Sequence, residues 1–223
     1  RSIVAANAYH GPGKGYFRMN STPKDGSSTE SEFNVYLGNI TGDIYVEGSA
    51  AGNRPEGNIV IGNSTQQAFD NIELQGHRLV VIGNLTNKLT TTPNAGNGTA
   101  DDFYISDSIV LGNYAFEMGD SDHHTGTREQ MAIHNSVVIG NNVGGKSHVV
   151  SPRLESSGTG VLEPSLGKGN IFANNVTEDR TTFILQKSLI SGNVVATSDI
   201  EQSYGSVITF HSGMRLGHYA NSG

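Results

Sequence analysis

The amino-acid sequence predicts an all-β fold, a β-solenoid in which successive coils of the chain stack along one axis. Two observations predict it. A short apolar segment followed by Gly-Asn recurs along most of the chain, and Ser136-Val-Val-Ile-Gly-Asn-Asn142 is its clearest copy. The 223 residues also include 29 glycines, no cysteine and no tryptophan, and only 35% are hydrophobic. Such a composition is typical of turn-rich β structure rather than of a helical domain.

The repeat has several further copies with the same form, two or three mostly β-branched residues and then Gly-Asn. These are Asn58-Ile-Val-Ile-Gly-Asn63, Leu79-Val-Val-Ile-Gly-Asn84, Ser108-Ile-Val-Leu-Gly-Asn113 and Ser188-Leu-Ile-Ser-Gly-Asn193, with the looser Val35-Tyr-Leu-Gly-Asn39 and Gly169-Asn-Ile-Phe-Ala-Asn-Asn175. The glycines at 38, 62, 83, 112, 140 and 192 are mostly 21 to 29 residues apart, with one gap of 52. One short strand per 20 to 30 residues is the spacing of stacked coils.

Each part of the repeat has a physical role. The apolar residues are too few for a helix, and their β-branching favours an extended strand. Gly-Asn then ends the strand, because these residue types readily take the left-handed conformation of a sharp corner. Asparagines at the same corner of successive coils can hydrogen-bond along the stack. The predicted ladder residues are Asn63, Asn84, Asn113, Asn141 and Asn193.

The repeat also suggests a division of the chain. Residues 1–56 hold only the looser copy and are predicted to form a β-rich cap or connector, since a solenoid end needs covering. Residues 57–205 are predicted to be the solenoid, and residues 206–223 to be closing strands.

Charge and hydropathy exclude several classes of protein. The formal net charge is −7 and the pI is about 5.5, which argues against a nucleic-acid partner because phosphate binding needs clustered Lys and Arg. No apolar segment approaches the roughly 20 residues needed to cross a bilayer, so membrane insertion is not expected. The sequence contains no recognisable cofactor-binding motif, so no cofactor is predicted.

The segment richest in acidic and histidine side chains is Glu117-Met-Gly-Asp-Ser-Asp-His-His-Thr-Gly-Thr-Arg-Glu129. Cleavage of a glycosidic bond needs two carboxylates about 5 to 9.5 Å apart, and Asp120 and Asp122, with His123 as a base, are the candidate catalytic residues. The spacing does not match a zinc site, so no metal ligands are predicted. An exposed acidic loop without catalytic function explains the same residues.

Glycan binding without cleavage requires fewer specialised residues than catalysis does. It needs aromatic platforms and polar side chains along one face, and the candidates are Tyr104, Tyr114, Phe116, His124 and Arg128. Packing of the aromatic residues in the core is the alternative. A lyase, which needs a base and cations near the enolate, has a weaker candidate cluster in Lys146, His148 and Arg153.

Two families resemble the repeat. Gly169-Asn-Ile-Phe-Ala-Asn-Asn-Val176 and Ser188-Leu-Ile-Ser-Gly-Asn-Val194 resemble coils of right-handed parallel β-helices, the fold of pectate-lyase-like enzymes and many phage tailspikes. Asn135-Ser-Val-Val-Ile-Gly-Asn-Asn142 and Asp107-Ser-Ile-Val-Leu-Gly-Asn113 resemble the head repeats of trimeric autotransporter adhesins, which also occur in phage tail fibres.

These resemblances imply an elongated, trimeric protein of a virion or cell surface that handles host glycans. The function predicted from them is a phage tail fibre or tailspike segment that recognises cell-surface polysaccharide and contacts other virion tail proteins. Its predicted location is the virion tail or the extracellular surface. A polysaccharide-degrading β-helix enzyme, either a lyase or a glycoside hydrolase, and a bacterial trimeric adhesin head are the alternatives.

Overall fold

The protein is a parallel β-helix. The structure is a computed structural model, and it describes residues 1–8, 17–20, 33–47, 55–65, 71–91, 105–119, 131–145, 147–150, 169–184, 188–200, 207–210 and 215–218. Every element in these ranges is a strand, and every pair of neighbouring strands is parallel. The all-β solenoid predicted from the sequence is thus confirmed.

Sheet A contains the apolar segments of the repeat. Its strands are β1 (Ile3–Ala5), β3 (Val35–Leu37), β6 (Ile59–Ile61), β10 (Val80–Ile82), β13 (Ile109–Leu111), β16 (Val137–Ile139), β19 (Ile171–Ala173), the first part of β21 (Leu189–Ile200) and β22 (Val207–Phe210). Each strand pairs with the next without a shift in register as far as β21, so equivalent residues of successive coils lie directly above one another.

Sheets B and C complete each coil. Sheet B holds β2 (Phe17–Asn20), β4 (Ile40–Thr41), β5 (Ile44–Glu47), β7 (Ser64–Thr65), β8 (Asn71–Leu74), β11 (Leu85–Thr90), β14 (Tyr114–Met118), β17 (Asn142–Val143), β18 (Ser147–Val150), β20 (Val176–Ile184), the last part of β21 and β23 (Arg215–His218). Sheet C is short and holds β9 (Gly76–His77), β12 (Ile105–Ser106) and the end of β15 (Met131–His134), whose first residues pair in sheet B.

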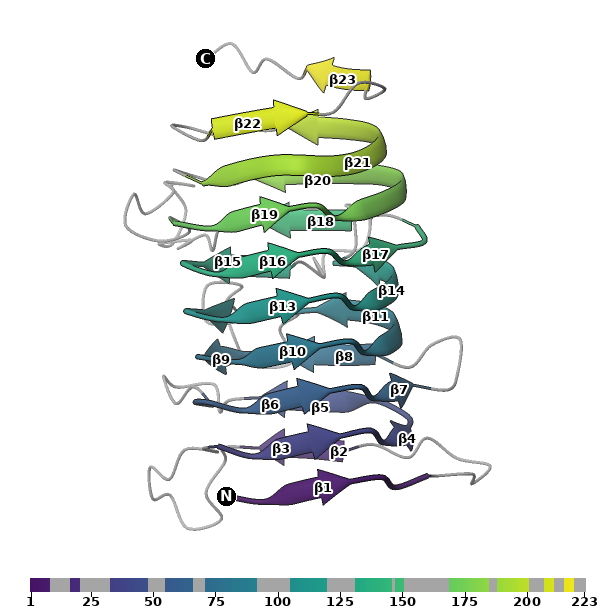
Figure 1. The fold of residues 1–223 in the computed structure, drawn as a ribbon, viewed down its shortest axis with the longest axis vertical. Coiled ribbons are helices and arrows are strands. Elements are labelled where there is room, and N and C mark those ends of the chain that lie inside the picture. The colour runs from purple at the N-terminus through teal and green to yellow at the C-terminus, as the bar shows by residue number, and fades with distance from the viewer. Residues whose placement is uncertain are drawn as a thin grey trace, which may run out of the picture.

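The chain winds in a right-handed sense. In Figure 1 it rises from the N-terminus, crosses the front in sheet A from left to right, turns at the right-hand edge and returns behind through sheet B. Right-handed crossovers are the rule for parallel strands because of the strand twist. The helix axis is therefore vertical in the figure, and a coil adds one strand to sheet A and one or two strands to sheet B.

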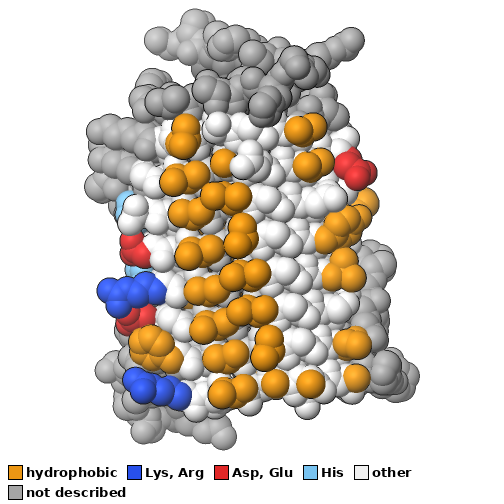
Figure 2. Space-filling view, in the orientation of Figure 1, with side chains coloured by type: hydrophobic (Ala, Val, Ile, Leu, Met, Phe, Trp, Pro, Cys, Tyr) orange, Lys and Arg blue, Asp and Glu red, His pale blue; other side chains and the backbone are white. Residues whose placement is uncertain are grey.

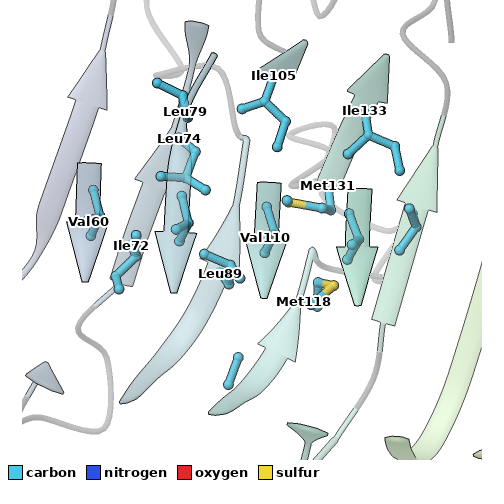
Figure 3. Close-up of a cluster of buried hydrophobic side chains, with 14 of the residues drawn as sticks. Val60, Ile72, Leu74, Leu79, Leu89, Ile105, Val110, Met118, Met131 and Ile133 are labelled. Carbon is cyan, nitrogen blue, oxygen red and sulfur yellow. The ribbon is translucent and has the colours of Figure 1, made fainter. Parts of the chain in front are cut away.

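The core is one continuous column of side chains between the sheets. Alternate residues along a strand point to opposite faces, so the middle residue of each sheet A strand points inward. Val60, Val81, Val110 and Val138 are fully buried in this way. Opposite them lie Ile72, Leu89 and Met118 of sheet B and Ile105 and Ile133 of sheet C (Figure 3).

The strands before residue 57 belong to the same sheets as those after it. Strands β1 and β3 continue sheet A below β6, and β2 and β5 continue sheet B below β8. The division into residues 1–56, 57–205 and 206–223 stays a prediction, whereas continuous strand pairing across residue 57 is observed.

Candidate functional site

The described part of the chain places some of the predicted site residues and not others. The candidate catalytic residues Asp120, Asp122 and His123 lie outside the described residues, as do Tyr104, His124 and Arg128. Tyr114 and Phe116 are described, and both belong to β14. The five predicted ladder asparagines are also described, and they fix the position of β14.

A column of asparagines runs along the corner between sheets A and B. In each coil the side chain accepts two hydrogen bonds from the asparagine of the coil before. For example, the backbone N–H and Nδ2 of Asn84 both donate to Oδ1 of Asn113 at 2.9 Å, and Asn113 donates in the same way to Asn141. The column comprises Asn7, Asn39, Asn63, Asn84, Asn113, Asn141, Asn175 and Asn193.

From Asn39 onward, each of these amides also donates backward along the stack. Nδ2 of Asn84 donates to the carbonyl of Val60 at 2.9 Å, and Nδ2 of Asn113 donates to that of Val81 at 3.1 Å. One side chain therefore links three coils, and nearly all of the column is buried. The residue before each asparagine has a positive φ, such as 62° at Gly83, and this conformation turns the backbone through the corner.

A second polar column, at the corner between sheets C and A, was not predicted from the sequence. Asn34 donates to Oδ1 of Asn58, the backbone N–H of Leu79 donates to Oγ of Ser108, and that of Ser108 donates to Oγ of Ser136. Ser136 donates in turn to Oδ1 of Asn170 at 3.0 Å. The available signal was the Asn or Ser that directly precedes most apolar segments of the repeat.

Tyr114 and Phe116 form an exposed aromatic pair on the outer face of sheet B. Ala115 between them is buried, so the two rings project to the same outer side, where Tyr114 is 43% and Phe116 is 52% exposed. The alternative that both rings pack in the core is therefore wrong. We call these two residues the sheet B aromatic pair.

Two glycines in the next coil make room for these rings. A Cβ at Gly144 would lie 3.0 Å from the hydroxyl of Tyr114 and 3.7 Å from the Phe116 ring. A Cβ at Gly145 would lie 2.8 Å from the carbonyl oxygen of Phe116 and 3.6 Å from its ring. The rings thus lie against the backbone of the next coil, where a larger residue would crowd them, while part of each ring stays exposed.

Polar groups border the aromatic pair. Asn142 of β17 lies directly opposite Tyr114 in the parallel register and is exposed. Lys88 and Glu117 lie opposite each other on β11 and β14, and Lys88 Nζ is 3.5 Å from Glu117 Oε2. Both partners of this ion pair are partly exposed. Among the described residues, Asn142 therefore offers hydrogen-bonding groups to a ligand on the rings.

A histidine and a serine meet in sheet C. His77 Nδ1 contacts Ser106 Oγ across adjacent strands, and Glu56 and Arg78 form an ion pair beside them. A hydroxyl beside an imidazole is the arrangement of an activated nucleophile. Ser106 is only 2% exposed, however, so a substrate cannot reach its oxygen, and we interpret this contact as structural.

The described residues contain no group of three or more acidic, histidine or cysteine side chains that could hold a metal ion. Within the same residues no helix has the length and apolarity needed to cross a membrane. Searches of protein-family models, of curated proteins and of solved structures found no match to this chain.

Proposed function

We propose that this protein is a rigid surface fibre of the phage tail-fibre or tailspike class, and that it binds host cell-surface glycan through the sheet B aromatic pair. The observation that carries the proposal is the pair of exposed rings, Tyr114 and Phe116, held on one strand and bordered by hydrogen-bonding side chains. The resemblance of the repeat to tailspike and tail-fibre coils supports the class.

The chemistry of the pair suits a sugar. The face of an aromatic ring is negative, and it attracts the slightly positive C–H groups that cover one side of a pyranose. Sugar hydroxyls at the edge of the ring then need hydrogen bonds, which the exposed Asn142 beside Tyr114 is placed to supply. Tyr114 and Phe116 alternate along one strand, so their Cα atoms are about 7 Å apart, enough to contact neighbouring parts of one oligosaccharide.

The rigidity of the site favours binding. Association costs about 0.5 to 1.5 kcal/mol for each side chain that must be immobilised. The asparagine column fixes the first residue of β14, because the backbone N–H of Tyr114 donates to the carbonyl of Asn84 at 2.8 Å. The backbone beneath the rings is therefore already ordered before a glycan binds.

The test is binding to a panel of immobilised bacterial capsular polysaccharides and lipopolysaccharide O-chains, measured by biolayer interferometry. We expect the wild type to bind at least one of them, and Tyr114→Ala and Phe116→Ala each to weaken that binding about tenfold or more, as the loss of a stacking ring does in other binding sites. Val194→Ala is the control, because Val194 is an exposed apolar residue of sheet B on β21, three strands away from Tyr114.

Binding of no polysaccharide in the panel, or equal binding by the wild type and both aromatic variants, would reject the proposal. The polysaccharides are also incubated with the protein and examined for shortened chains. Shortening would assign cleavage to the protein, and variants of Asp120, Asp122 and His123 would then be the next to measure.

A further inference from the structure

The outer face of sheet A is apolar from β1 to the start of β21. The first and third residues of each strand point outward, and from β1 to the start of β21 all of them except Ser191 are hydrophobic. We call this surface the sheet A face, and its residues are Ile3, Ala5, Val35, Leu37, Ile59, Ile61, Val80, Ile82, Ile109, Leu111, Val137, Ile139, Ile171, Ala173, Leu189 and Ser191.

Figure 2 shows this face as two continuous columns of hydrophobic side chains without a charged group between them. Several of these side chains are well exposed, with Leu37 at 45%, Ile109 at 43% and Leu111 at 38%. A strand that faces solvent on one side normally alternates apolar and polar residues. Sheet A instead has the composition of a sheet that is covered on both sides.

The face is large enough for a specific interface. Successive coils are about 4.8 Å apart, so eight strands span roughly 34 Å, and a three-residue strand is about 10 Å long. With the side chains included, the face covers on the order of 600 Å², the upper end for the largest apolar patch of a monomer. Two such faces in contact would bury about 1,200 Å², where specific interfaces begin.

We infer that the sheet A face binds a second copy of this chain. The partner has to be as long as the stack, flat, apolar and repeated at the same 4.8 Å, because the face carries those features without interruption. A second copy has all four properties. Two flat sheets pack face to face about 10 Å apart with interdigitating side chains, as in a β-sandwich.

Charge favours the same partner. Two copies with a net charge of −7 each repel one another wherever their acidic groups come close. The sheet A face has no ionisable side chain from Ile3 to Ser191, so this is the surface on which two copies meet without like-charge contacts. Both polar columns flank the face, and they keep its strands in register for the partner.

The inference is independent of the proposed glycan binding, because the sheet B aromatic pair lies on the other side of the asparagine corner. It also gives the predicted trimer a surface on which subunits can meet. Either a dimer or a trimer satisfies it, provided that the sheet A face is the contact.

The test is the solution mass by light scattering and analytical ultracentrifugation, with the double variant Leu37→Lys/Leu111→Lys. We expect the wild type to have a multiple of the monomer mass of 23.6 kDa. The double variant should associate at least about 100-fold more weakly, because a buried interface with facing like charges costs several kcal/mol. The two leucines lie on β3 and β13, well apart along the stack.

The matched control is Leu85→Lys/Val194→Lys, which adds the same charge at apolar residues of similar exposure, 49% and 54%, beyond the asparagine corner. It should assemble as the wild type does. Circular dichroism checks that all variants keep their β structure, and Leu37→Thr/Leu111→Thr, which retains strand propensity, replaces the lysine variant if that one unfolds. A monomeric wild type, or equal loss of assembly in the control, would overturn the inference.

Discussion

Asparagines within the column stabilise the fold through hydrogen bonds to the coils on either side of them. Asn141 accepts from both the backbone and the side-chain N–H groups of Asn113, and its Nδ2 donates to Oδ1 of Asn175 at 2.8 Å and to the carbonyl of Val110 at 3.2 Å. These groups are buried, so a missing partner is not replaced by water. The value of each asparagine lies mainly in the polar groups of its neighbours that it satisfies.

The adjacent residues Asn141 and Asn142 allow a matched comparison. Asn141→Ala leaves the two donors of Asn113 without their acceptor, and each unsatisfied buried group costs about 1 to 3 kcal/mol. We expect a loss of about 3 kcal/mol in the free energy of unfolding, measured by urea denaturation. Asn142 is exposed, so Asn142→Ala should change this quantity by less than about 0.5 kcal/mol. Equal effects of the two changes would contradict a role for the buried column.

Tyr36 makes the stability of the folded state depend on pH in the alkaline range. Burial raises the pKa of its phenol above the ordinary value of 10.0, because the charged phenolate is poorly solvated in the core. The folded state therefore keeps a proton that the unfolded state releases, and stability is unaffected below pH 10 but falls as the pH rises above it. We expect the wild type to lose more stability than Tyr36→Phe between pH 9 and pH 11.

The measurement for Tyr36 is the urea midpoint of both proteins across this pH range. All other titratable groups are the same in the two proteins, so the difference between the two curves isolates Tyr36. Parallel curves would show that ionisation of this residue is not linked to folding.

At the scale of elements, the sequence predicted the strands of sheet A best. Most of them are short apolar segments ended by Gly-Asn, and the pattern is local, so a single copy such as Val137–Ile139 can be recognised on its own. The corners follow from the same residues. Asn174 occupies the corner position at which most coils have glycine, and its φ is 53°. Asparagine can replace glycine there because it is one of the few other residues that adopt this left-handed conformation.

Sheet C could not be predicted from local pattern. Its strands are as short as Gly76–His77 and Ile105–Ser106, and a two-residue strand has no periodicity to detect. They are strands because the flanking coils hold them in register, with Ile105 paired to both Gly76 and Ile133. The second polar column depends on the same stacking, so the role of its Asn and Ser residues can be recognised only when the coils are aligned.

The candidate site was partly visible in the sequence. Aromatic residues at 114 and 116 follow a Gly-Asn corner, which places them at the start of a strand, and the outward direction of both rings follows from alternation once one of them is known to be exposed. The role of Gly144 and Gly145 could not be predicted, because it depends on which residues of the next coil lie beside the rings.

At the scale of the whole molecule, the two proposed surfaces have different tasks. Sheet A is a long apolar face suited to self-association, whereas the sheet B aromatic pair is a small site suited to a glycan. The asparagine corner lies between them and holds both sheets to the same 4.8 Å repeat. An assembly joined through sheet A therefore presents one copy of the sheet B site from each subunit, with all copies attached to one rigid body.

This arrangement predicts avidity. On a surface densely coated with the glycan, several sites of one assembly bind together, and the gain over a single site is typically 10²- to 10⁴-fold. We expect the Leu37→Lys/Leu111→Lys variant to lose a factor of this order on a dense surface in biolayer interferometry. Its affinity for a short soluble oligosaccharide should stay within about twofold of the wild type, because its sheet B site is unchanged.

Lowering the glycan density supplies the control, since the wild type should then lose its advantage while the monomeric variant is unaffected. A loss of affinity for the soluble oligosaccharide in the variant would mean that sheet A contributes to the glycan site itself. Equal binding of both proteins at every density would mean that the assembled sites cannot reach one surface together, because avidity disappears when geometry prevents simultaneous contact.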